Sequence, residues 1–221
     1  SIIEEFYMTF FDMNRDRGIT LKLCIAVVCG LLAFGNASAQ KANRADPDTD
    51  TTKTKQAQAV SKEVYERITQ AQEMVDEKDY NGALRLLNNL YNPDKLTEYE
   101  QANVLNYIGF VYYNMDDVTN AVRTYERMLA IPSLEPQMAK QTTYTMVQLL
   151  TMQEQYAKAL STLEKWFTLE TNPAPEPYIL KAQILYKLNR FGDIVEPIET
   201  EMDVARARDN PVKEERYGLM N

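Results

Sequence analysis

The sequence has 221 residues, with 24 Lys and Arg against 32 Asp and Glu, so the chain carries a net charge of −8. It therefore lacks the basic footprint of a nucleic-acid-binding protein, and anionic lipid surfaces are equally poor partners. There is no histidine, and the two cysteines, Cys24 and Cys29, both lie near the start. Histidine-based catalysis and Cys–His nucleophiles are therefore excluded. Cys/His zinc sites and disulfides are excluded in the residues after Cys29, and no cofactor or metal site is expected.

The first part of the chain has the pattern of an export signal. Three basic residues between positions 15 and 22 precede the apolar run 23–34, and Ala37-Ser38-Ala39 follows. This is the pattern of a secretory signal peptide, with cleavage predicted between Ala39 and Gln40. The apolar run has 12 residues, whereas a membrane-spanning helix needs about 20. Residues 1–39 are therefore predicted to be a signal-peptide region, with Met13 the expected natural start, and the mature protein to be periplasmic without a membrane anchor.

Residues 40–60 are polar and contain few aliphatic side chains. Such a segment cannot bury enough apolar surface to order itself, so it is predicted to be a flexible linker. We expect a plain tether here rather than a partner-binding segment. After cleavage, 21 basic and 28 acidic residues remain, for a net charge of −7.

Apolar residues recur with helical spacing from residue 61 onward. Within 102–132, Leu105, Ile108, Gly109 and Tyr112 are spaced i, i+3, i+4 and i+7, and the same spacing restarts at Val118. This pattern predicts two amphipathic helices joined at residues 114–117. An isolated hairpin of this size cannot bury its apolar stripe, so neighbouring hairpins are expected.

The neighbours follow from a fixed period in the sequence. Ala83, Ala121 and Ala159 are separated by 38 residues, and the residues three positions before and four positions after each alanine repeat with them. In a fourth copy the period shortens to 35, and Ile194 takes the alanine position. Repeats of this length are typical of stacked helical hairpins.

Several residues have a predicted local role within these repeats. Gly109 should allow close packing, Gly82 and Gly192 should lie at hairpin turns, and Thr97-x-x-Glu100 resembles a capping box. Pro197 should lie in the first turn of a helix if Asp193 caps it, and should kink the helix if that helix starts earlier. The paired carboxylates of Asp116-Asp117 and Glu98-x-Glu100 are interpreted as turn and helix-start residues rather than as catalytic or calcium-binding groups. The sequence therefore offers no candidate active site.

The columns Leu105, Ile108, Gly109, Tyr112, Ala121, Tyr125 and Pro132 resemble the tetratricopeptide repeat. The resemblance implies an all-α, right-handed superhelix of about four helical hairpins. The predicted repeats are 61–96, 97–134, 135–173 and 174–209, and Asn210-Pro211 marks the start of a further helix in 210–221.

In the tetratricopeptide family the first helix of each hairpin lines a concave wall that binds partner segments. By the same columns, the resemblance implies that the following residues bind a partner here: Asn103, Asn106, Phe110, Tyr113, Gln141, Tyr144, Gln148, Gln183 and Tyr186, with Thr151 in the same set. These side chains are amide or aromatic, with hardly a charge, so they suit the main chain of an extended peptide. The alternative is that they are merely solvated polar residues.

The export signal followed by degenerate repeats also resembles the periplasmic tetratricopeptide proteins that accompany TonB, ExbB and ExbD systems in Gram-negative bacteria. This resemblance implies a non-enzymatic scaffold or adaptor in TonB-dependent uptake, with TonB, ExbB or ExbD components as partners. The alternative is a scaffold in outer-membrane protein assembly or cell-wall organisation.

Overall fold

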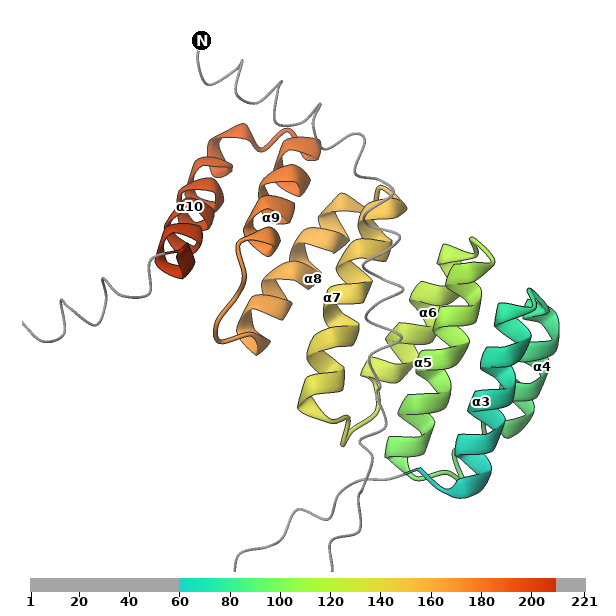
Figure 1. The fold of residues 1–221 in the computed structure, drawn as a ribbon. Helices are drawn as coiled ribbons and strands as arrows, with labels where there is room; N and C mark the ends of the chain where they lie inside the picture. The colour runs from blue at the N-terminus through green and yellow to red at the C-terminus, as the bar shows by residue number, and fades with distance from the viewer. Residues whose placement is uncertain (1–59, 210–221) are drawn as a thin grey trace, which may run out of the picture.

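A computed structural model describes residues 60–209, and its helices stack side by side in chain order (Figure 1). The predicted signal peptide, nearly all of the predicted linker and the predicted further helix in 210–221 lie outside the described residues. The helices are α3 (Lys62–Asp76), α4 (Tyr80–Leu90), α5 (Glu98–Asn114), α6 (Val118–Leu129), α7 (Pro136–Met152), α8 (Tyr156–Leu169), α9 (Glu176–Lys187) and α10 (Val195–Asp209), with a 3-10 turn, η1 (Phe191–Asp193), before α10.

The helices pair into four hairpins within the described residues. We call α3, α5, α7 and α9 the A helices and α4, α6, α8 and α10 the B helices. Each A helix packs against the B helix that follows it, and each of the first three B helices packs against the next A helix. This confirms the predicted all-α solenoid of helical hairpins. None of the described helices combines the length and apolar character needed to cross a bilayer.

Each hairpin turns at one residue in the left-handed backbone conformation. These residues are Lys78, Asp116, Glu154 and Asn189, at intervals of 38, 38 and 35 residues. After each of them the next backbone N–H donates to the carbonyl five residues earlier, as from Asp117 to Tyr112 (2.9 Å). The turns therefore repeat with the predicted period, including the shorter last interval, and give every A helix the same register against its B helix.

Small residues in the repeat columns set the distance between paired helices. A Cβ added at Gly109 of α5 would lie 2.7 Å from the ring carbon Cζ of Tyr125 in α6. Tyr125 is 1% exposed and fills this space between the two helices. The predicted packing role of Gly109 is thus confirmed. Ala83, Ala121 and Ala159 are likewise fully buried in their B helices.

Gly82 does not lie at a turn as predicted; it is the third residue of α4. Its backbone N–H donates to the carboxylate of Asp79, the N-cap of that helix (2.9 Å). A Cβ at residue 82 would collide with this carboxylate, so glycine is required by the cap rather than by a turn.

Pro197 breaks the start of the fourth B helix. The chain leaves the hairpin turn as the 3-10 turn η1, and α10 begins at Val195. Proline has no backbone N–H, so an α-helix starting at Phe191 would lose one hydrogen bond there. In the structure Pro197 is the third residue of α10, in its first turn, as predicted. Asp193 is not the cap of this helix, because it ends η1 and Ile194 lies between it and Val195.

Candidate partner-binding surface

The carboxylate of Glu100 holds the starts of two A helices together. Its Oε2 accepts hydrogen bonds from the backbone N–H (3.0 Å) and hydroxyl (3.0 Å) of Thr97, while the Thr97 hydroxyl accepts from the N–H of Glu100 (3.2 Å). This is the capping box predicted for α5, and it is confirmed. The other oxygen, Oε1, accepts from the N–H of Ser61 (2.9 Å), the N-cap residue of α3. Glu100 therefore fixes α3 against α5.

These hydrogen bonds also control the ionisation of Glu100. Burial of this side chain would raise its pKa, but the hydrogen bonds from Ser61 and Thr97 outweigh that effect and lower the pKa from 4.5 to about 2. Each of them is donated to the charged form, which is the form they stabilise. Glu100 is therefore ionised at neutral pH although it is only 6% exposed.

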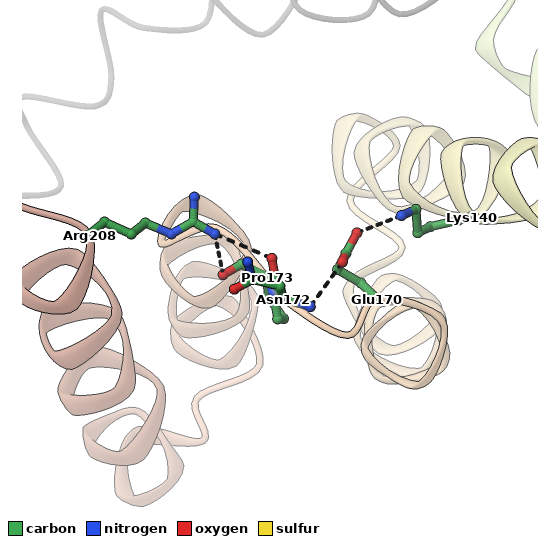
Figure 2. A network of polar contacts seen from close by, with 5 residues as sticks. All are labelled: Lys140, Glu170, Asn172, Pro173 and Arg208. Carbon is green, nitrogen blue, oxygen red and sulfur yellow. Dashed lines mark hydrogen bonds and ion pairs between the residues drawn. The ribbon is translucent and has the colours of Figure 1, made fainter. Parts of the chain in front are cut away.

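A second polar network links the third and fourth hairpins (Figure 2). Lys140 of α7 forms an ion pair with Glu170 at the end of α8 (2.8 Å), and the backbone N–H of Asn172 donates to the same carboxylate (3.0 Å). Arg208 of α10 donates to the carbonyl oxygens of Asn172 (3.3 Å) and Pro173 (3.1 Å). The hydrogen bond from Lys140 lowers the pKa of Glu170, and the Asn172 N–H adds to this effect. This network restrains the connection into α9.

The nine predicted partner-binding residues, which we call the A-helix face, lie on α5, α7 and α9. Their spacing places them on one side of each helix. They differ in exposure: Gln141 and Tyr186 are exposed, Asn106, Phe110, Tyr113, Tyr144 and Gln183 are half-buried, and Asn103 and Gln148 are buried.

Asn103 and Gln148 differ from the expected solvent-facing residues, because each is only 6% exposed. The side-chain amide of Asn103 donates to the carbonyl of Tyr99 one turn earlier (2.8 Å), so it is bound to its own helix. Thr151, in the same set, also donates to its own helix, at the carbonyl of Val147 (2.8 Å). The accessible part of the A-helix face is therefore smaller than predicted and is formed by the seven other residues.

Aromatic rings connect the A-helix face to the core between α7, α8 and α9. Tyr144 of α7 lies against Trp166 of α8, with ring centroids 4.9 Å apart. Trp166 contacts Phe167 (5.3 Å), and Phe167 contacts Tyr178 of α9 (4.9 Å). Trp166 is the only tryptophan of the chain and is 7% exposed. Its fluorescence should therefore respond to changes at Tyr144.

The first A helix carries residues of the same columns that the sequence analysis did not name. Tyr65 lies 38 residues before Asn103, and Gln72 lies 38 residues before Phe110. Both are exposed, Tyr65 to 40%. The 38-residue period alone would have identified both residues. With these two, the A-helix face extends over all four hairpins. Its side chains are amide or aromatic, and the one charged residue in these columns of residues 60–209 is Glu176, exposed at the start of α9, 35 residues after Gln141.

No group of three or more Asp, Glu, His or Cys side chains gathers to hold a metal ion in residues 60–209. The paired carboxylates have structural roles, as predicted: Asp117 caps α6, and Glu98 and Glu100 lie in the first turn of α5.

Comparison with known proteins identifies no family for this chain. No family model matches it, and no curated protein matches it. Among solved structures it is similar to MamA from Desulfovibrio magneticus RS-1 (residues 41 to the end; 13% identity, TM-score 0.34, covering 68% of this chain and 99% of that one). It is also similar to MamA of MSR-1 (10% identity, TM-score 0.31, covering 66% of this chain and 98% of that one). This likeness is too distant to assign a function, and the chain's own geometry is that of a helical-hairpin solenoid.

Proposed function

We propose that this protein is a non-enzymatic scaffold that binds an extended protein segment along the A-helix face. The observation that supports this proposal is the amide and aromatic character of that face, whose columns hold one charged residue, Glu176. Charged residues make up 25% of the chain and are mostly exposed in proteins, so this face is poorer in charge than a merely solvated surface would be.

The chemistry of these side chains suits the main chain of a partner. Asn106, Gln141 and Gln183 make no hydrogen bond with other described residues that would occupy their amides, and each amide offers both donors and an acceptor. Tyr186 and Phe110 add rigid contact area at a low entropic cost. We expect the partner segment to bind mainly through its backbone, so that it needs no particular charge pattern. The protein would select among the partner's side chains only near the aromatic residues.

Location and partner are inferred from the sequence. The signal-peptide pattern in residues 1–39 supports export to the periplasm. The resemblance to periplasmic repeat proteins of TonB, ExbB and ExbD systems supports a role as an accessory component of TonB-dependent uptake. The absence of histidine, and of cysteine beyond residue 29, supports a binding rather than a catalytic role.

In-cell photo-crosslinking tests this proposal. The probe is placed separately at Asn106 and at Gln141, which are half-buried and exposed on the A-helix face, whereas Tyr144 is avoided because its ring packs on Trp166. Lys158, exposed on the B helix α8, is the control position.

We expect crosslinks to a TonB-type component or its receptor from the two A-helix positions and not from Lys158. Crosslinks to outer-membrane assembly or cell-wall proteins would retain the scaffold and refute the uptake role. Equal labelling from Lys158 would refute the assignment of the binding face.

A further inference from the structure

The exposed side of the first three B helices is basic. Their hairpins turn at equivalent residues 38 positions apart, so positions 38 residues apart lie on the same side of α4, α6 and α8. In α6, Asn120, Arg123 and Arg127 are spaced i, i+3 and i+7 and share one side of the helix. In the three columns that these positions define, the first three hairpins carry cations and no carboxylate. We call the five exposed cations of these columns the basic ridge: Arg85, Arg123, Arg127, Lys158 and Lys165.

The cations of the basic ridge are not neutralised within residues 60–209. None of their side chains forms an ion pair or a hydrogen bond with another described residue, whereas five other cations, among them Lys140 and Lys181, pair with carboxylates. The Arg127 guanidinium instead lies 5.0 Å from the centroid of the Tyr91 ring, at the end of α4. This cation–π contact holds Arg127 between the first two hairpins without cancelling its charge. A chain with a net charge of −8 therefore keeps five unpaired positive charges on one side of three helices.

Carboxylates border the basic ridge on two sides. Glu126 of α6 and Glu164 of α8 are exposed and occupy the column beside it. In the fourth hairpin the columns of the ridge carry Asp193 and Glu196 in place of cations. The basic surface is thus narrow: it crosses three helices and ends where the fourth hairpin begins. In the first three hairpins its columns hold no apolar side chain.

We propose that the basic ridge binds an extended, acidic segment of a partner protein, and that it is a second binding surface, separate from the A-helix face. A narrow segment can lie along the five cations without approaching Glu126 and Glu164. An anionic membrane or a nucleic-acid duplex is broader and would meet these carboxylates, which repel it. A membrane would also find no apolar side chain in the ridge that could enter it.

The net charge of the chain does not prevent this binding. At physiological salt, charges are screened beyond about 8 Å, so a bound carboxylate interacts mainly with the nearest cations. Exposed ion pairs are weak and sensitive to salt, whereas main-chain hydrogen bonds to the A-helix face depend little on it. The two surfaces should therefore differ in their salt dependence. A photo-probe at Lys158 reports the acidic segment, and only a partner shared with Asn106 and Gln141 bears on the A-helix face.

Fluorescence anisotropy with the full chain tests the proposal. The probe is a labelled peptide of alternating Glu and Ser, and a peptide of alternating Lys and Ser is its control. Replacing Arg123 and Lys165 together by Gln should weaken binding of the acidic peptide about three- to thirtyfold, as expected for two exposed ion pairs. The matched control, Arg67→Gln with Lys187→Gln, removes two exposed cations that lie on A helices. It should weaken binding less than about twofold, because distant charges are screened.

The proposal is supported if the acidic peptide binds more tightly than the basic one, if added salt weakens this binding, and if only the ridge variant lowers it. It is overturned if the two peptides bind equally or if both double variants have the same effect. Tighter binding to phosphatidylglycerol vesicles than to the peptide, lost in the ridge variant, would assign the ridge to a membrane. A dimer that dissociates in the ridge variant would assign it to a second copy, and either result overturns the proposal.

One further variant separates this proposal from the proposed function. Asn106→Ala on the A-helix face should leave binding of the acidic peptide unchanged. If it weakens that binding as much as the ridge variant does, the peptide binds at the A-helix face, which overturns the ridge and retains the scaffold. All substituted positions are exposed or half-buried, and helical circular dichroism verifies that each variant stays folded.

Discussion

Replacing Glu100 by Gln removes the charge that joins the starts of α3 and α5 while keeping the size of the side chain. The amide nitrogen that replaces one oxygen accepts no hydrogen bond, so either the N–H of Ser61 or the N–H and hydroxyl of Thr97 lose their acceptor. The pKa of Glu100 is lowered from 4.5 to about 2, which corresponds to about 3 kcal/mol of stabilisation at neutral pH. Since Gln retains one acceptor, we expect a loss of about 1–3 kcal/mol in the free energy of unfolding.

The sign of the pH dependence follows from the direction of the pKa shift. The pKa of Glu100 is lower in the folded than in the unfolded chain, so its contribution is complete above about pH 5 and is lost as the pH falls towards about 2. The stability difference between wild type and Glu100→Gln should therefore be largest at pH 7 and disappear near pH 2. Other carboxylates also titrate in this range, and comparing the two proteins cancels their effect.

Urea unfolding at a series of pH values measures this difference, with Trp166 fluorescence and helical circular dichroism as two independent signals. Glu63→Gln is the matched control: it removes the same charge from the first turn of α3, where Glu63 is exposed and makes no hydrogen bond with the described residues. The reasoning is refuted if Glu63→Gln destabilises as much as Glu100→Gln. It is also refuted if the difference between wild type and Glu100→Gln stays constant between pH 7 and pH 2.5.

Two further pairs of substitutions test the packing and the turns. Gly109→Ala places a methyl group 2.7 Å from the Tyr125 ring and should lower the free energy of unfolding, measured in urea, by about 1–3 kcal/mol. Gly192→Ala is the control and should not, because no atom lies within 4 Å of its new Cβ. Equal effects of the two substitutions would contradict the packing argument. Glu154 adopts a left-handed φ of 58°, so Glu154→Gly should raise the free energy of unfolding by about 0.5–1 kcal/mol. The control is Gln153→Gly: Gln153 has a φ of −83°, and this change should lower the free energy of unfolding.

The short-range features of this protein follow from its sequence because they depend on residues within one or two helical turns. The capping box at Thr97 and the individual hairpin turns are set by such local spacing. Helical periodicity needs only the chain geometry of one helix, so the pattern of apolar residues is sufficient to predict it. The same repeat intervals also identify which residues make up the A-helix face.

Only the tertiary structure shows which side chains of the A-helix face are accessible and which helices are linked by hydrogen bonds. Glu100 bonds to Ser61, 39 residues away, and that contact exists only because adjacent hairpins stack with their A-helix starts together. Asn103 and Gln148 are buried because burial depends on the packing of neighbouring hairpins as well as on the face of one helix. Local hydrogen bonding is determined by spacing along the chain, whereas burial and contacts between hairpins are determined by the geometry of the whole solenoid.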